Sequence, residues 1–165
     1  MTTPQRSYVM SRIHSKDTKP ELIVRKYLWS RGYRYRKNDR RLPGTPDIVL
    51  KKYATVIFIH GCFWHGHDHI VWPKTNAEFW RNKIERNRLR DAEDKRKLKE
   101  LGWSVMTVWE CQLKKEVRDK TLMGIEYLLN ENFLQRMAMK PHHSKCYDMP
   151  DEQHDLAAEP QKYQK

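Results

Sequence analysis

The run Thr55–His60, with the sequence TVIFIH, constrains the fold of this chain more than any other feature. It is nearly all apolar and shows no regular alternation of apolar and polar side chains. Such a run predicts a central β-strand covered on both faces, because a strand with one solvated face alternates. Other elements of the chain must provide that cover, which predicts an α/β fold.

Helices and further strands flank this run. The capping-box spacing of Thr18 and Glu21 predicts a helix that begins there and ends before Gly32. The other elements are expected at Tyr33–Arg36 (strand), Asp47–Leu50 (strand), Asn76–Leu101 (helix, capped by Thr75 or Asn76), Trp103–Trp109 (a buried strand) and Asp119–Phe133 (helix). The inward side of the last helix is expected to carry Leu122, Ile125, Leu128 and Leu129. This order predicts an α/β sandwich with a mixed central sheet flanked by helices.

Charge is distributed unevenly along the chain, whose formal net charge is +12. From residue 141 onward three lysines stand against five acidic residues, so residues 1–140 carry +14. We expect a basic N-terminal arm at residues 1–16, one domain at residues 17–140 and a flexible polar tail at residues 141–165. The basic body favours a polyanionic partner, nucleic acid before an anionic membrane, although a lysine-rich soluble surface is the simpler alternative. Aromatic residues interleaved with the basic ones favour nucleic acid.

The sequence also bears on location. No apolar run approaches the length needed to span a bilayer, and the N-terminal residues MTTPQRSYVM lack the apolar stretch of a signal peptide. We therefore expect a cytoplasmic protein that does not associate with membranes. The odd number of cysteines, three in all, argues against a disulfide framework.

Four cysteine and histidine side chains have the types and spacing of a metal site. They are Cys62, His67, His69 and Cys111. Cys62 and Cys111 each follow a predicted strand, so they meet if those two strands are neighbours. Two cysteines and two histidines suit tetrahedral Zn²⁺ with no open position, which predicts a structural zinc site. Two alternatives remain, namely buried thiols with solvated histidines nearby, and Asp68 as a ligand in place of His69.

Asp47 is a candidate ligand for a harder metal. It follows Gly44-Thr45-Pro46 and opens a predicted strand, an arrangement that resembles the PD-(D/E)xK nucleases, in which Mg²⁺ lies beside a phosphodiester. The usual second acid and lysine are absent from the next strand. The backbone carbonyl of Ile59 can replace the acid, and a histidine can replace the lysine. The alternative is that Asp47 is simply a strand-end aspartate.

Further acid–base candidates have simpler readings beside the catalytic one. His60 and His65 remain after the zinc ligands are assigned, and they are either catalytic groups or spare histidines of a polar loop. Glu21 is either a site residue or only the capping-box partner of Thr18. Asp91 is either a site residue or one of many acids on a charged helix.

Aromatic side chains next to basic ones suggest a wedge that enters stacked bases. Phe63 and Trp64 are adjacent in the predicted metal loop, and Trp80 comes early in the long basic helix. Inserted rings discriminate a mismatched duplex from a perfect one, because unstacking costs least at a weak step. The alternative is that the rings pack on the sheet, which we favour for Trp103 and Trp109.

Taken together, these motifs resemble the very short patch repair endonucleases of bacteria. The resemblance extends from about Arg6 to Phe133. It rests on Arg6-Ser7, Met10, Asp17-Thr18, Glu21, Pro46-Asp47, residues 60–67 (HGCFWHGH), residues 75–80 (TNAEFW), Asn87, Asp91, Leu101-Gly102-Trp103 and Trp109-Glu110-Cys111.

The resemblance implies a PD-(D/E)xK restriction-endonuclease-like core and an activity. The enzyme would nick one strand 5′ to the thymine of a T·G mismatch, which arises by deamination of 5-methylcytosine. Its double-stranded DNA substrate would be bound by a monomer, and mismatch-repair proteins and a cytosine methyltransferase would be plausible partners. A related restriction-type endonuclease and a non-catalytic, zinc-containing DNA-binding module are the alternatives.

The resemblance also implies roles for individual residues. Catalytic Mg²⁺ would bind Asp47 and the carbonyl of Ile59, where the family often has threonine. His65 would activate water and be oriented by Asp91, while His60 would help at the phosphate and Glu21 would complete the site. Structural Zn²⁺ would bind the two cysteines, His67 and His69, although many members have cysteine at the last of these positions. The intercalating side chains would be Phe63, Trp64, Trp80 and Met10.

Overall fold

The computed structural model describes residues 17–139, and the expected N-terminal arm and C-terminal tail lie outside this range. The chain forms α2 (Lys19–Ser30), β1 (Arg36–Lys37), β2 (Ile48–Leu50), the 3₁₀ turn η1 (Lys51–Tyr53), β3 (Thr55–His60), α3 (Ala77–Glu100), β4 (Ser104–Trp109), the 3₁₀ turn η2 (Glu110–Leu113) and α4 (Arg118–Ala138). None of the helices between residues 17 and 139 is long and apolar enough to cross a membrane.

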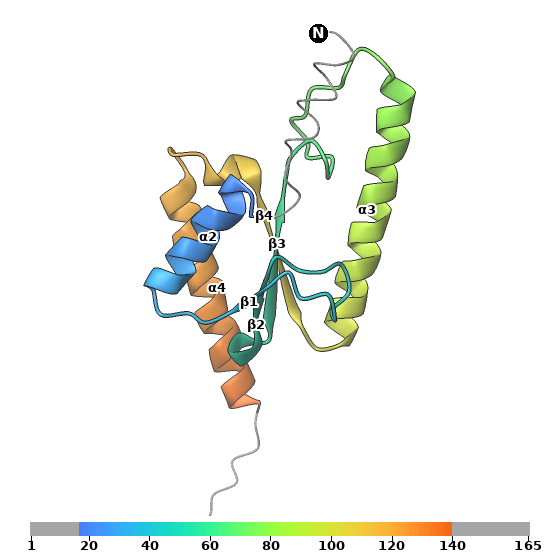
Figure 1. The fold of residues 1–165 in the computed structure, drawn as a ribbon. Coiled ribbons are helices and arrows are strands. Elements are labelled where there is room, and N and C mark those ends of the chain that lie inside the picture. Colours follow the sequence, from blue (N-terminus) through green and yellow to red (C-terminus); the bar gives the residue numbers. More distant parts are fainter. Residues whose placement is uncertain (1–16, 140–165) are drawn as a thin grey trace, which may run out of the picture.

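The four strands form one mixed sheet in the order β1-β2-β3-β4. The first two pairings are antiparallel, and β3 pairs with β4 in parallel along its whole length, from Thr55 opposite Ser104 to His60 opposite Trp109. Helices α2 and α4 cover one face of the sheet and α3 covers the other (Figure 1). The α/β sandwich predicted from the sequence is confirmed.

The central strand β3 divides the core into two layers. Ile57 belongs to the cluster beneath α2 and α4, together with Leu28 and Leu129, and all three are fully buried. Val56 and Phe58 belong to the cluster beneath α3, together with Leu98. Successive residues of a strand point to opposite faces, so each layer receives every second side chain of β3. This explains why the run is apolar throughout.

Two local predictions were wrong. Tyr33–Arg36 is not a strand, and only Arg36 enters the sheet, in β1. Tyr33 is instead buried in the core, where its hydroxyl donates to Oδ1 of Asn130 on α4 at 3.0 Å. Leu128 is 45% exposed, because the buried stripe of α4 follows Leu122, Ile125 and Leu129.

Residues 103–109 were predicted to form a buried strand. The strand is present, but most of it is not buried. β4 is the edge of the sheet beyond β3, so most of its residues are half-buried and Val108 alone among its six residues is buried. The α3 helix begins after Asn76 as expected. Asn76 nevertheless makes no side-chain capping bond, and its φ of 55° places it in the left-handed region.

Candidate active site and metal centre

A cavity of about 830 Å³ opens at the carboxyl end of β3. It lies where α2, the start of β2, the end of β3 and the middle of α3 converge. Its lining includes all six residues predicted for catalysis and Mg²⁺ binding, namely Glu21, Asp47, Ile59, His60, His65 and Asp91. Residues separated by 70 positions in the sequence therefore share one site.

Asp47 is held at the cavity wall by the backbone of β3. Its Oδ2 accepts a hydrogen bond from the Ile59 N–H at 2.7 Å. The antiparallel ladder of β2 and β3 ends at Ile48 and Ile57, so Ile59 has no strand partner on this side. In an extended strand the N–H and C=O of one residue point to the same edge, so the Ile59 carbonyl also faces the Asp47 side.

The environment of Asp47 disfavours its charge. Burial and the negative charge of Glu21 raise the pKa of its carboxyl group to about 6, although the Ile59 N–H and Arg25 act in the opposite direction. Among residues 17–139, the Ile59 N–H is the one hydrogen-bond donor to this carboxylate, and it binds Oδ2. Oδ1 is thus available to a cation that enters the cavity.

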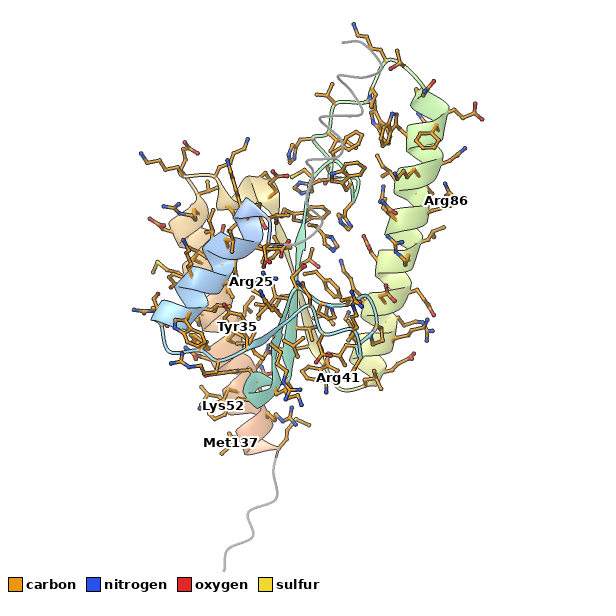
Figure 2. The ribbon with its side chains drawn as sticks, viewed as in Figure 1. Arg25, Tyr35, Arg41, Lys52, Arg86 and Met137 are labelled. Atoms are coloured by element: carbon orange, nitrogen blue, oxygen red, sulfur yellow. The ribbon has the colours of Figure 1, made fainter. Side chains whose placement is uncertain are left out.

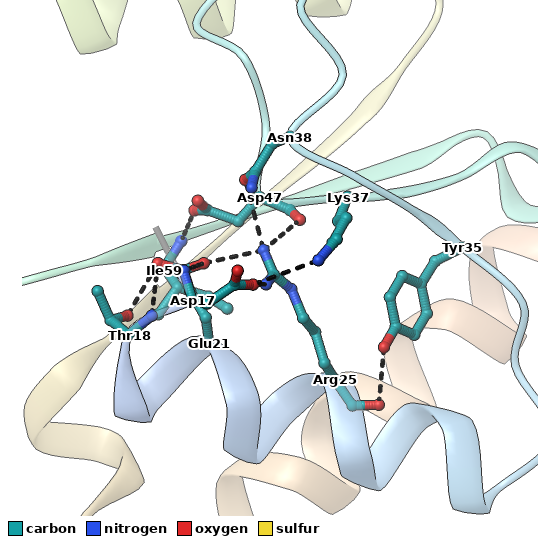
Figure 3. Close-up of polar contacts among 9 residues, drawn as sticks. All are labelled: Asp17, Thr18, Glu21, Arg25, Tyr35, Lys37, Asn38, Asp47 and Ile59. Carbon is teal, nitrogen blue, oxygen red and sulfur yellow. Dashed lines mark hydrogen bonds and ion pairs between the residues drawn. The ribbon is translucent and has the colours of Figure 1, made fainter. Parts of the chain in front are cut away.

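Glu21 is the capping-box partner of Thr18 and also lies at the cavity wall. Its carboxylate caps α2 by accepting hydrogen bonds from Thr18 Oγ1 (2.8 Å) and from the backbone N–H of Asp17 (3.1 Å). The same buried carboxylate lines the cavity and pairs with Arg25 at 2.8 Å (Figure 3). The capping box fixes this acid at the cavity wall.

Arg25 is a buried residue of the site that the sequence reasoning missed. Its guanidinium group lies between α2 and the sheet (Figure 2). It pairs with Glu21 and Asp17 and donates to the backbone carbonyl of Asp47 at 3.2 Å. The one available signal was its position, one helical turn after Glu21 and next to the buried Val24. Arg25 thereby connects the capping acid to the start of β2.

His65 and Asp91 form a tight pair beside Asp47. His65 Nδ1 lies 2.5 Å from Asp91 Oδ2, which places the ring proton on Nδ1 and leaves Nε2 as the acceptor of a neutral imidazole. Burial raises the pKa of Asp91, but the hydrogen bond from His65 and the nearby positive charge outweigh it, and the net pKa lies below its ordinary value. Asp91 is therefore an ionised acceptor that orients the ring.

His60 lies beneath this pair. Its ring stacks on that of His65 with centroids 3.7 Å apart and an interplanar angle of 11°. Burial, together with the neighbouring His65, lowers the pKa of His60 to about 3. His60 is consequently neutral near physiological pH and supports the His65 ring as a flat surface.

The loop after β3 is tied to α3. Asn87 on α3 donates to the carbonyl of Trp64 at 2.9 Å. Gly66 has a φ of 66°, and a Cβ atom there would lie 2.7 Å from Cγ2 of the buried Ile84. Only glycine fits this approach. The loop therefore carries His65 at a fixed distance from Asp91.

The predicted zinc ligands also come together. The ligand atoms of Cys62, His67, His69 and Cys111 all lie within 4.8 Å of one another. Cys111 Sγ is 3.5 Å from His67 Nδ1, and tetrahedral Zn²⁺ separates its ligands by about 3.3–3.8 Å. The donor set fits zinc, and within residues 17–139 the group contains His69 and not Asp68.

Parallel pairing explains this convergence. His60 and Trp109 are the last partners of the β3–β4 ladder, so Cys62 and Cys111 each follow two residues later. Trp109 lies between the cysteine–histidine cluster and the cavity. Its ring stacks on that of His67 with centroids 4.1 Å apart, and it makes an edge-to-face contact with the ring of His60 with centroids 5.4 Å apart. Trp103 packs against the core cluster beneath α3, as expected.

Three of the four predicted intercalating residues form one cluster, and Met10 lies outside the described residues. The rings of Phe63, Trp64 and Trp80 have centroids 5.2–5.9 Å apart in edge-to-face arrangements. None of the three is buried. Trp64 also lines the cavity that holds Asp47, so the ring cluster borders the candidate active site.

The sequence matches one family and several characterised proteins. A family model described as DNA mismatch endonuclease Vsr matches residues 1–70. The chain is 56% identical over 117 residues to the type II nicking enzyme V.NmeAIP of Neisseria meningitidis serogroup A, a match that covers 68% of this chain and 82% of the relative. It is 45% identical over 115 residues to the type II nicking enzyme V.XorIIP of Xanthomonas oryzae, covering 68% and 85%.

A further relative bears the family name. The chain is 41% identical over 134 residues to the DNA mismatch endonuclease Vsr of Escherichia coli K12, and the match covers 80% of each chain. The resemblance inferred from the motifs is thereby confirmed. The chain belongs to the Vsr family of DNA mismatch endonucleases.

Proposed function

We propose that this mismatch endonuclease nicks one strand of duplex DNA 5′ to the thymine of a T·G mismatch. The observation that carries the proposal is one cavity in which Asp47, the Ile59 backbone and the His65–Asp91 pair lie beside the ring cluster of Trp64. The core would be of the PD-(D/E)xK type, and the protein would act as a monomer in the cytoplasm. Contact with mismatch-repair proteins belongs to the same proposal.

Mg²⁺ suits the donor set at Asp47. This ion prefers oxygen ligands and retains several waters, and the cavity offers Asp47 Oδ1 and the Ile59 carbonyl on the same side. When bound, Mg²⁺ would polarise the phosphate and lower the pKa of a water. Glu21 adds a second carboxylate at the wall, and Arg25 holds it there.

His65 is the residue best placed to remove a proton from the attacking water. Its Nε2 is left as the acceptor, because Asp91 holds the proton on Nδ1. His60, neutral and stacked against it, would keep the ring plane fixed and help at the phosphate from its place in the cavity lining. The four-residue cluster would hold structural Zn²⁺ and fix the loop that carries His65.

Nicking assays over a panel of mismatches test this proposal. Purified protein with Mg²⁺ should nick the thymine strand of T·G duplexes in at least one sequence context and spare the matched duplex. Equal cleavage of matched and mismatched duplexes would favour the restriction-type alternative. Binding without cleavage in every context would favour a non-catalytic module.

Replacing Asp91 with asparagine should reduce the nicking rate by about 10²- to 10⁴-fold. The asparagine amide can donate to His65 Nδ1, which reverses the tautomer and removes the acceptor at Nε2. Single-turnover nicking of a T·G duplex measures the effect. Asp94→Asn, which alters another acid of the cavity wall, is the matched control and should retain most activity. Equal losses in both variants would contradict the orienting role of Asp91.

Replacing Trp64 with alanine should weaken the preference for mismatched DNA. Stacking of a base on an aromatic ring contributes about 1–3 kcal/mol, so binding of the T·G duplex should fall by roughly 5- to 150-fold. Binding to matched duplex should change less, because insertion there is opposed by intact stacking. Trp29→Ala, which removes an exposed ring stacked on Arg34, is the control. An unchanged mismatch preference in Trp64→Ala would exclude Trp64 from the wedge.

A further inference from the structure

The inward stripe of α3 contains a lysine. Along this helix the side chains that face the sheet and the cavity recur every three or four residues, as Ile84, Asn87, Asp91, Lys95 and Leu98. Ile84 and Leu98 are buried, and Asn87 and Asp91 hold the Trp64 carbonyl and the His65 ring. The other four residues of the stripe thus each have a packing or hydrogen-bonding partner on the inward side. Lys95 is the one stripe residue whose inward position these contacts do not explain.

Lys95 is half-buried at the wall of the cavity that holds Asp47 and His65. Within residues 17–139 its ammonium group has no acidic partner within 4.0 Å and no hydrogen bond. The nearby Arg96, Lys97 and Lys99 are exposed. Burial lowers the pKa of Lys95, although the charge of Asp91 partly opposes this. An unpaired cation in this position lowers stability unless a ligand meets it.

The charge of the cavity wall indicates what that ligand is. Five carboxylates line the cavity against two cationic side chains, Arg90 and Lys95. The buried cation Arg25 is already engaged by Glu21 and Asp17. A phosphodiester that enters this cavity meets a surplus of negative charge, so it needs a cation besides a bound metal. Of the two cationic side chains in the cavity lining, Lys95 is the one that faces inward.

On the basis of the proposed function, we propose that the Lys95 ammonium group contacts the phosphate that is cut. A lysine serves as a compact point charge for phosphate oxygens. PD-(D/E)xK nucleases carry their lysine on the strand, but β3 of this chain has none. Here α3 would supply the cation from the opposite wall of the cavity, one turn after Asp91.

Lys95→Met tests the assignment, with Lys99→Met as the matched control. Lys99 is an exposed lysine one turn further along α3, so its replacement removes the same charge from the same helix. In single-turnover nicking of a T·G duplex, Lys95→Met should be slower by about 10- to 100-fold, because a charge contact made in the transition state is lost. Lys99→Met should be close to wild type, and Lys95→Arg should recover part of the rate.

A neutral phosphate provides a second readout that a structural role would not affect. A methylphosphonate at the cut position removes one phosphate charge. Without Mg²⁺, the affinity for the methylphosphonate duplex relative to the phosphate duplex should be lower for wild-type protein than for Lys95→Met, because only wild-type protein loses the lysine contact. Equal affinity ratios in the two proteins would overturn the contact. Thermal unfolding should show that Lys95→Met is at least as stable as wild type, because methionine suits the inward stripe.

Different results would contradict the proposed nicking function and the assignment of Lys95 to the phosphate. If wild-type protein nicks no T·G duplex, the proposed function is wrong. If wild-type protein nicks and Lys95→Met nicks at the same rate, the assignment of Lys95 alone is wrong. A marked fall in melting temperature of Lys95→Met would also overturn it, since that result assigns the lysine a structural role.

Discussion

Asp47→Asn should abolish nicking of a T·G duplex and leave the protein folded. The substitution keeps an oxygen that can accept the Ile59 N–H, so the local backbone is preserved. It removes the negative charge that would hold Mg²⁺, and the metal contributes several kcal/mol to the transition state. We expect the single-turnover rate to fall by at least about 1,000-fold. Asp39→Asn is the control, because its side-chain oxygen can still accept the hydrogen bond from the Arg41 backbone N–H.

Stability provides an independent check on the same variant. Burial raises the pKa of Asp47 to about 6 in the folded protein, above the ordinary value of about 3.9. In the metal-free protein, the contribution of the Asp47 carboxyl group to the free energy of unfolding is fully present below about pH 4. It is lost as the pH rises through about 6. At about pH 8, Asp47→Asn should therefore melt at or above the temperature of wild type without Mg²⁺, and the difference should shrink toward pH 4. A lower melting temperature at about pH 8 would contradict this account of Asp47.

If the cluster of Cys62, His67, His69 and Cys111 holds structural Zn²⁺ as proposed, loss of that metal should unfold the loop between β3 and α3. Structural Zn²⁺ contributes on the order of 10 kcal/mol, which is comparable with the whole stability of a domain. Cys111→Ser removes one thiolate from the cluster and should lower both metal content and melting temperature. Inductively coupled plasma mass spectrometry and thermal unfolding measure the two effects.

The third cysteine supplies the control for this experiment. Cys146→Ser removes a thiol that lies outside the described residues, and it should retain one zinc per chain. Cys111→Ser should also lose nicking, because Trp109 connects His67 of the cluster to His60 of the candidate active site. Full zinc content in Cys111→Ser would show that the cluster is not the metal site.

The features predicted correctly from the sequence are those fixed by local pattern. The apolar run of β3 indicated a doubly covered strand, and Cys62 and Cys111 could be paired once their strands were taken as neighbours. The errors arose where tertiary contacts decide. Nothing in the order of residues places β4 at the edge of the sheet or turns Leu128 outward.

Charged residues on helices were the hardest to interpret. Arg25 is buried because Asp17, Glu21 and the Asp47 carbonyl surround its guanidinium group, and these partners come from two elements. Lys95 could not be told apart from the other charged residues of its helix in the sequence, because only the packing of α3 on the sheet separates inward from outward positions. Residue type alone favours a solvated face for both.

The parallel register of β3 and β4 limits where this chain can change in length. Cys111 lies in η2, directly after the end of β4, so insertion of one residue between Trp109 and Cys111 would displace the thiol from its position 3.5 Å from His67 Nδ1. The same holds for the short link between His60 and Cys62. We therefore expect insertions and deletions to be harmful at these two links and better tolerated in the stretch at residues 70–76, which leads into α3.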